Sequence, residues 1–147
     1  MGISAAMAGV GEMSGTGYIG YQHPPFEVRV TRESLDRFNQ AIGVAGAGAD
    51  SPAPPTYMKV IEGEGGSSRA ILTALDIKLH RVLHAEQSFE YHAPIHAGDV
   101  LEVHRGISDH YTRKNGTREF LVIESRILRA DKTLVGGSRQ ILILRNI

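Results

Sequence analysis

The chain of 147 residues carries 16 Lys or Arg and 16 Asp or Glu residues, so its formal charge is zero and no basic surface for nucleic acid is expected. It has no cysteine, which excludes disulfides, thiolate metal sites and a cysteine nucleophile. No apolar run approaches the ~18 residues that span a bilayer, and residues 1–17 lack a signal-peptide pattern. We therefore expect a cytoplasmic protein with a flexible tail over residues 1–22 and one domain over residues 23–147.

The first half of the domain is predicted to be mainly helical. A short strand over residues 26–30 alternates apolar and charged side chains. Thr31 is a suitable N-cap for a helix that ends at Gly43. After a loop over residues 43–55, two short helices are predicted over residues 56–61 and 68–75.

From about residue 82 the apolar period changes to two, which is typical of strands. Four strands are predicted to follow one another as a meander, with Asn115-Gly116 as the strongest turn signal. Their ranges are 82–92, 99–112, 118–129 and 134–145. The order of elements favours an α+β fold with an antiparallel sheet on one helical layer. Such a sheet leaves an exposed edge strand, and dimerisation is a common way to cover it.

Ionisable residues are densest over residues 83–104. His84 and Glu86 are two apart, so on a strand they are expected to share a face, where they could share a proton, while Gln87 is expected to face the other way. The alternative is structural, with His84 bonded to a backbone carbonyl and Glu86 bridging to an arginine. Two pairs of histidines lie four residues apart, but no metal site is expected, because one pair lies in a predicted strand and Pro94 interrupts the other.

Residues 83–99, LHAEQSFEYHAPIHAGD, resemble the signature LHGEQ-x-F-x-[YF]-[HR]-x-P-[IL]-x-x-GD of N-terminal-type domains in the MaoC-like dehydratase family. Residues 53–58, APPTYM, resemble the APPTF element of the same family. The resemblance implies a hot-dog fold, in which an antiparallel sheet of about five strands wraps around a central helix. It also implies acyl thioesters of CoA or acyl-carrier protein as substrates, no further cofactor, and activity as an R-specific 3-hydroxyacyl dehydratase or enoyl hydratase.

The chain departs from the family at the catalytic motif D-x-N-P-x-H, whose Asp and His hold a water or hydroxyl between them. Alignment on Gly43 places Val44 at the position of the Asp and Ala49 at that of the His, and neither side chain can move a proton. This pattern resembles the half-domains and subunits that shape the acyl tunnel without a dyad of their own. The resemblance therefore implies a homodimer, or a heterodimer with a catalytic MaoC-like chain.

In the implied fold, the start of the second helix faces the thioester, where free amides could bind its carbonyl oxygen. We therefore expect Asn39, Pro55, Thr56, Tyr57 and Tyr91 to bind substrate, although capping and core packing are the simpler roles for some of them. Two rival functions remain. One is an acyl-CoA thioesterase of the hot-dog fold that uses Glu62 or Glu64, and the other is a catalytically silent subunit that binds acyl thioesters.

Overall fold

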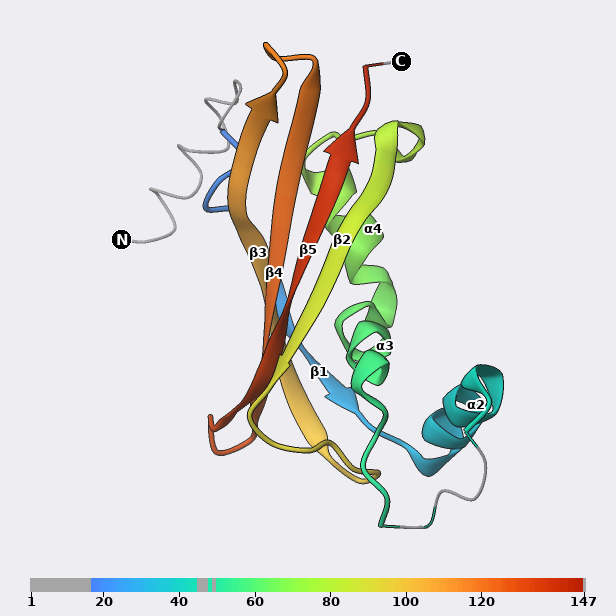
Figure 1. Cartoon of the computed structure of the whole chain (residues 1–147). Helices are drawn as coiled ribbons and strands as arrows, with labels where there is room; N and C mark the ends of the chain where they lie inside the picture. The colour runs from blue at the N-terminus through green and yellow to red at the C-terminus, as the bar shows by residue number, and fades with distance from the viewer. Residues whose placement is uncertain (1–16, 45–47, 49, 147) are drawn as a thin grey trace.

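The computed structural model describes residues 17–44, 48 and 50–146. Five antiparallel strands form one curved sheet (Figure 1). The strands are β1 (Gln22–Arg29), β2 (Val82–Tyr91), β3 (Val100–Arg113), β4 (Arg118–Arg129) and β5 (Leu134–Leu144). The helices are α2 (Arg32–Ile42), α3 (Met58–Glu62) and α4 (Ser67–Ala74), with 3-10 turns at Pro55–Tyr57, Glu64–Gly66 and Leu79–Arg81. Of the helices, α3 and α4 lie along the concave face of the sheet, and α2 lies beyond α3 at one end (Figure 1).

The predicted α+β class is confirmed, and so are the helices and the four C-terminal strands, to within a few residues at their ends. Helix α2 begins where the hydroxyl of Thr31 accepts a hydrogen bond from the backbone N–H of Ser34 at 3.1 Å. It ends at Gly43, whose φ of 83° is left-handed and therefore suits glycine. Among the helices of the described residues, none is long and apolar enough to cross a membrane.

The prediction that the last four strands form a meander is wrong for β2. The strand order is β1-β3-β4-β5-β2, so β2 pairs with β5 and forms one edge of the sheet, while β1 forms the other. Residues 92–99 carry the chain across the end of the sheet, from a bond between His92 N–H and the Val135 carbonyl to a bond between Gly98 N–H and the Val30 carbonyl. Pro94 cannot donate to a ladder, and Ile95 is fully buried, so this segment closes one end of the core.

Strand β1 begins at Gln22, four residues earlier than predicted. Its two prolines lie at a register irregularity between His23 and Phe26, which an edge strand tolerates because its outer N–H groups need no partner. Of the expected tail, residues 1–16 lie outside the described residues. Tyr18 and Tyr21 pack against the apolar core.

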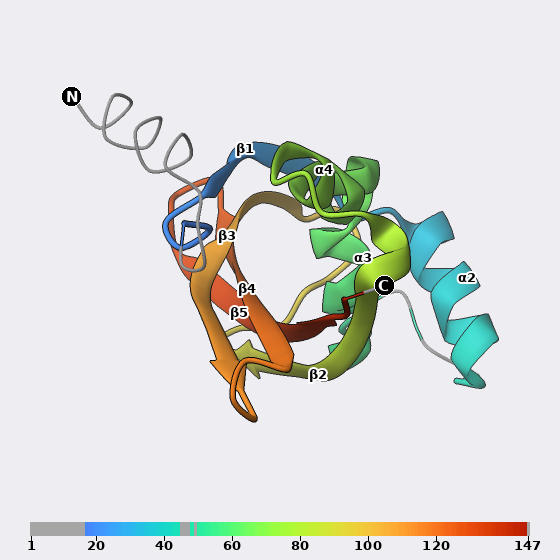
Figure 2. The same ribbon diagram turned by 90° about the horizontal axis from the view of Figure 1, so that it is seen from above.

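The core consists of two apolar clusters, and each is centred on a different helix. Tyr57, Met58 and Ile61 of the α3 segment pack in one cluster, and Ile71 and Leu72 of α4 pack in the other. Seen from above, the sheet curls around both helices (Figure 2). The expected central helix is thus two short helices with a break between them.

Candidate functional site

The break in the central helix lies where glycine residues allow a left-handed backbone. Gly65 and Gly66 have φ of 68° and 75°, so the chain turns sharply between the end of α3 and the start of α4. Arg105 of β3 contacts both sides of this break. Its Nη1 donates to the carbonyl of Glu62 at 3.1 Å and to the hydroxyls of Ser67 and Ser68, each at 2.8 Å.

Arg105 is only 1% exposed, although its side chain is charged. Its remaining contacts reach the sheet, from Nε to Ser125 Oγ at 2.9 Å and from Nη2 to Gln140 Oε1 at 3.2 Å. Burial lowers the pKa of Arg105, and the nearby Glu62 carboxylate opposes that effect. A buried charge is tolerated only when its hydrogen-bonding groups have partners, and here both helices and two strands supply them.

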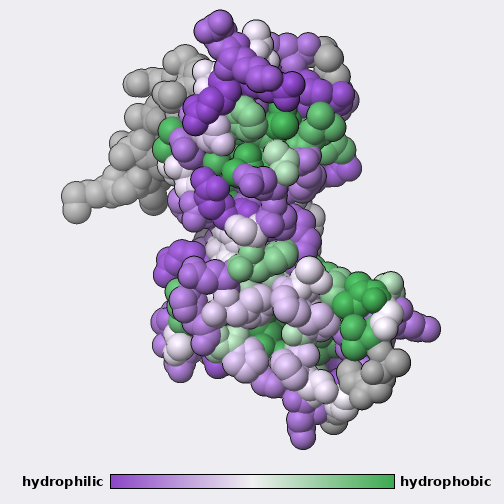
Figure 3. All heavy atoms as spheres, viewed as in Figure 1, coloured by the Kyte–Doolittle hydropathy of each residue, from purple (hydrophilic) through white to green (hydrophobic). Residues whose placement is uncertain are grey.

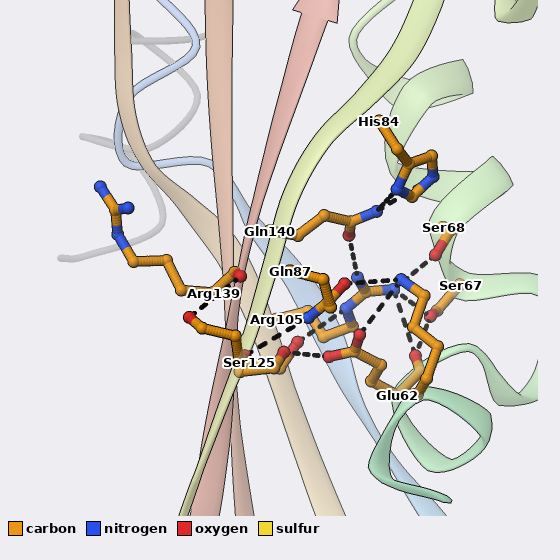
Figure 4. Close-up of polar contacts among 12 residues, drawn as sticks. Glu62, Ser67, Ser68, His84, Gln87, Arg105, Ser125, Arg139 and Gln140 are labelled. Carbon is orange, nitrogen blue, oxygen red and sulfur yellow. Dashed lines mark hydrogen bonds and ion pairs between the residues drawn. The ribbon is translucent and has the colours of Figure 1, made fainter. Parts of the chain in front are cut away.

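Glu62 provides the opposite charge and is fully buried. Its carboxylate accepts hydrogen bonds from the Ser138 hydroxyl and, at 3.2 Å, from Lys59 Nζ. Lys59 also donates to Gln87 Oε1 at 3.2 Å, so the polar network extends from α3 to edge strand β2 (Figure 4). Because both carboxylate oxygens are occupied, Glu62 is poorly suited to the role of thioesterase base.

His84 lies at the β2 end of this network. Gln140 Nε2 is 3.2 Å from Nδ1 and 3.4 Å from Nε2 of the imidazole. Burial lowers the pKa of His84, the positive charge of Lys59 lowers it further, and Glu62 opposes both.

His84 and Gln140 border a cavity of about 260 Å³ between α4 and β2. Apolar side chains form most of its wall, and polar side chains form the rest. The apolar residues are Leu72, Leu79, Val82, Ile123 and Leu142, and the polar ones are Ser68, Arg69, His84 and Gln140. The cavity can accept an apolar group that carries a polar atom.

The prediction that His84 and Glu86 share a face is wrong. The register of β2 against β5 shifts between them, so His84 lies opposite Leu142 while Glu86 lies opposite Ile141. Leu142 and Ile141 are adjacent in β5 and therefore face opposite sides of the sheet. The β-bulge turns Glu86 away from His84 and places Gln87 on the side of His84, which reverses the expected arrangement.

Two of the expected substrate-binding residues are tyrosines with well-defined partners. Tyr57 is 2% exposed, and its hydroxyl lies 2.8 Å from Ser34 Oγ. Tyr91 donates its hydroxyl hydrogen to the carbonyl of Pro55 at 2.6 Å. Burial raises the pKa of Tyr91 to about 12, so this phenol stays protonated and joins β2 to the start of the helical segment.

Asn39 and Thr56 differ in their exposure. Asn39 is 7% exposed on α2, and its Oδ1 has no hydrogen-bond partner. Thr56 is exposed in the turn ahead of α3.

Tyr57 and Glu64 border a second cavity of about 610 Å³ between β1, α2 and α3. His84 borders the cavity between α4 and β2 instead. The structure therefore does not gather the expected site residues in one place.

The position aligned with the family's catalytic Asp is exposed, since Val44 is 44% accessible. Ala49, aligned with the catalytic His, lies outside the described residues. In the part of the chain that the structure describes, the histidine ion pairs join His92 to Glu90, His104 to Glu102 and His110 to Glu119. Over residues 17–44, 48 and 50–146, no group of His, Asp or Glu side chains could hold a metal ion.

Sequence reasoning missed the role of Arg105. The sequence signal is that Arg105 alternates in step with Leu101, Val103 and Ile107. These residues lie two apart along β3, face inward and are all buried. A charged residue at such a position must find buried partners, and the inward-facing Ser138 and Gln140 of β5 are two of the residues in the network.

The chain is similar in sequence to a known family and to curated proteins. The family model described as FAS1-like, dehydratase domain region, matches residues 17–136. A UPF0336 protein of Thermobifida fusca is 31% identical over 96 residues, which cover 65% of this chain. The match covers 62% of the relative's own length.

Solved structures with the same fold include chains of two complexes from Mycobacterium tuberculosis. One is the C-terminally truncated HadBC (3R-hydroxyacyl-ACP dehydratase) complex, with a TM-score of 0.70, 20% identity and coverage of 84% of this chain and 93% of that chain. The other is the ChsH1-ChsH2 complex, with a TM-score of 0.68, 16% identity and coverage of 97% of both chains. The hot-dog fold expected from the sequence is thereby confirmed.

Proposed function

This chain belongs to the FAS1-like dehydratase domain family, and we propose that it is the subunit of an R-specific 3-hydroxyacyl-thioester dehydratase that shapes the acyl pocket. The catalytic Asp and His come from a partner chain. The observation that carries this proposal is a dehydratase-family match over residues 17–136 in a chain that has Val44 in place of the acid.

Edge strand β2 supports a partnership with a second chain of the same fold. It is paired on one side only, with β5, and Leu83 on it is 45% exposed. An unpaired edge presents backbone N–H and C=O groups that a second strand can bind. The HadBC and ChsH1-ChsH2 structures are both complexes, which supports the same type of assembly here.

The cavity between α4 and β2 is the place we assign to the acyl chain. Its apolar wall suits hydrocarbon, and it adjoins edge strand β2, where the partner would dock. In this arrangement the partner supplies proton transfer, while this chain binds and orients the thioester.

The experiment compares this chain alone with its complex with a MaoC-like partner encoded beside it. Hydration of trans-2-octenoyl-CoA is followed by loss of enoyl-thioester absorbance, with the partner alone as a second reference. We expect no hydration above background from this chain and rapid hydration by the complex. A complex in which the partner's dyad histidine is replaced by alanine is the matched control and should be inactive.

Three results would contradict the proposal. Strong hydration by the isolated chain would show that it carries its own catalytic groups. Release of free CoA with the acyl chain unhydrated would favour the thioesterase reading, in which exposed Glu64 remains an available carboxylate. A partner that is equally active with and without this chain would leave it only the role of a silent subunit.

A further inference from the structure

Gln140 connects the buried arginine to the histidine at the cavity. It is 2% exposed, its Oε1 accepts from Arg105 Nη2 at 3.2 Å, and its Nε2 lies 3.2 Å from His84 Nδ1. Arginine can only donate hydrogen bonds, so the amide oxygen must face Arg105 and the NH₂ group must face His84. The orientation of the Gln140 amide therefore follows from its buried partner.

This orientation restricts the protonation of His84. A carboxamide NH₂ group can only donate, so the ring nitrogen that it meets must carry a lone pair. An imidazolium has N–H on both nitrogens and would place two donors against each other. Because Nδ1 is the nearer nitrogen, the proton of the neutral ring is expected on Nε2.

The nearby charges act on His84 in opposite directions: Lys59 lowers its pKa and Glu62 raises it. Lys59 of α3 is the positive charge that acts on His84, and Arg69 of α4 borders the same cavity. Glu62 is the acid that faces the network, and its two oxygens are bound by Ser138 and Lys59. Lys59 therefore disfavours a positive charge on His84, and Glu62 offsets this effect only in part.

We propose that Gln140 is a positioning residue that holds His84 as a neutral imidazole, whose remaining N–H donates to an oxygen of the acyl thioester bound in the cavity between α4 and β2. The identity of the ligand rests on the function proposed above, whereas the state of the ring does not. His84 is then a hydrogen-bond donor for substrate and not a general base. The cavity favours acyl groups whose carbonyl or hydroxyl oxygen reaches this donor.

The ring state is tested by ¹⁵N spectroscopy of histidine side chains in the full chain, with His84→Ala to assign the His84 signals. At neutral pH we expect the neutral form with the proton on Nε2. Gln140→Leu removes the donor and should produce a mixture of the two neutral tautomers. Gln140→Glu replaces it with an acceptor and should raise the pKa of His84 by about one to two units, because an adjacent carboxylate favours the imidazolium.

The matched control is Gln87→Glu, because Gln87 lies directly opposite Gln140 on the neighbouring strand. It adds the same charge nearby but leaves the Gln140 amide in place, so the rise in the pKa of His84 should be much smaller. Circular dichroism confirms that each variant is folded. An imidazolium at neutral pH in the wild-type chain, a proton on Nδ1, or a spectrum that Gln140→Leu leaves unchanged would overturn the positioning role.

The donor role is tested separately, by binding of trans-2-octenoyl-CoA to the inactive complex in which the partner's dyad histidine is replaced by alanine, so that the ligand is not turned over. His84→Ala should weaken binding roughly tenfold, and His84→Gln should restore much of it, because a carboxamide can donate as the neutral ring does. Equal affinity of the wild type, the alanine variant and the glutamine variant would overturn the donor role. If no acyl thioester binds any form, the proposed function fails, and the ¹⁵N spectra alone then decide whether Gln140 positions His84.

Discussion

Two ionic clusters in this protein resemble each other in composition, but the first is buried and the second is partly exposed. In one, Arg105 and Glu62 join the break between α3 and α4 to the sheet, and Gln140 connects them to a cavity. In the other, at the far end of β3 and β4, His110 Nε2 lies 2.6 Å from Glu119 Oε2, and Arg81 Nη2 lies 3.3 Å from Glu119 Oε1.

The second cluster joins segments that are distant in sequence. Arg81 Nε donates to the Arg145 carbonyl at 2.6 Å, and the ring of Tyr18 lies 4.8 Å from that of His110. The His110 side chain is 2% exposed, and its Nδ1 has no hydrogen-bond partner. His110 is in the wall of neither of the two cavities described above. The two clusters thus differ in that Gln140 connects the buried Arg105 to residues that border a cavity, which makes the first cluster the better candidate for a role beyond stability.

The largest expected effect is the loss of stability when the first cluster loses Arg105. Arg105→Met leaves Glu62, Ser67 and Ser68 without their buried donor, so the free energy of unfolding should fall by about 3–5 kcal/mol. Urea unfolding, monitored by circular dichroism, measures this free energy. The control is Arg126→Met on the exposed side of β4, where a change within about 0.5 kcal/mol is expected. Equal losses in both variants would show that the Arg105 network is not a stabilising unit.

A smaller loss is expected at the second cluster. His110→Ala leaves the Glu119 carboxylate without one buried partner, which should cost about 1–3 kcal/mol. His110→Gln retains a donor at the same position and should recover part of that loss. The same urea experiment measures both, and hydration by the complex with the partner should remain at the wild-type rate. A loss of turnover in a folded His110→Ala complex would contradict the view that this cluster is purely structural.

The smallest expected effect is the dependence of the free energy of unfolding on pH. Burial lowers the pKa of His84 below its usual 6.5, and burial followed by the charge of Arg105 does the same for His23. Below pH 6.5 the unfolded chain therefore binds protons that the folded chain does not. The free energy of unfolding is therefore highest above pH 6.5, where both rings are neutral. It decreases as the pH falls from 6.5 toward the lower pKa values that the two rings have in the folded chain.

Urea midpoints of the wild type and His84→Gln, measured at about pH 7.5 and about pH 5.5, check this expectation. The wild type should lose more stability on acidification than the variant, because glutamine does not titrate. An identical loss in both proteins would show that His84 has the same pKa folded and unfolded.

Local patterns predicted most of the elements because short-range chemistry determines them. Thr31 and Gly43 set the ends of α2 through a capping hydrogen bond and a left-handed φ. The alternation of β3 to β5 placed the apolar residues on the inner face. The pairing of β2 with β5 could not be predicted in this way, because it depends on how residues 92–99 cross the sheet.

The candidate site was predicted less well than the fold. His84 was expected to form a catalytic pair with Glu86. It borders a cavity, but Glu86 faces the other side of the sheet because of one bulge. A bulge changes the face of every later residue in a strand, and the sequence around Ala85 contains no glycine or proline to signal it.

The sequence by itself determined the α+β class, the dehydratase-family signature and the loss of the acid at Val44, because each depends on residue identity over a short span. Only the tertiary structure decided that Arg105 is buried, that Glu62 is occupied by Ser138 and Lys59, and that Gln140 faces His84. The contacts of Glu62 with Ser138 and of Gln140 with His84 join residues 76 and 56 positions apart along the chain, so they exist only after the sheet has closed over the helices.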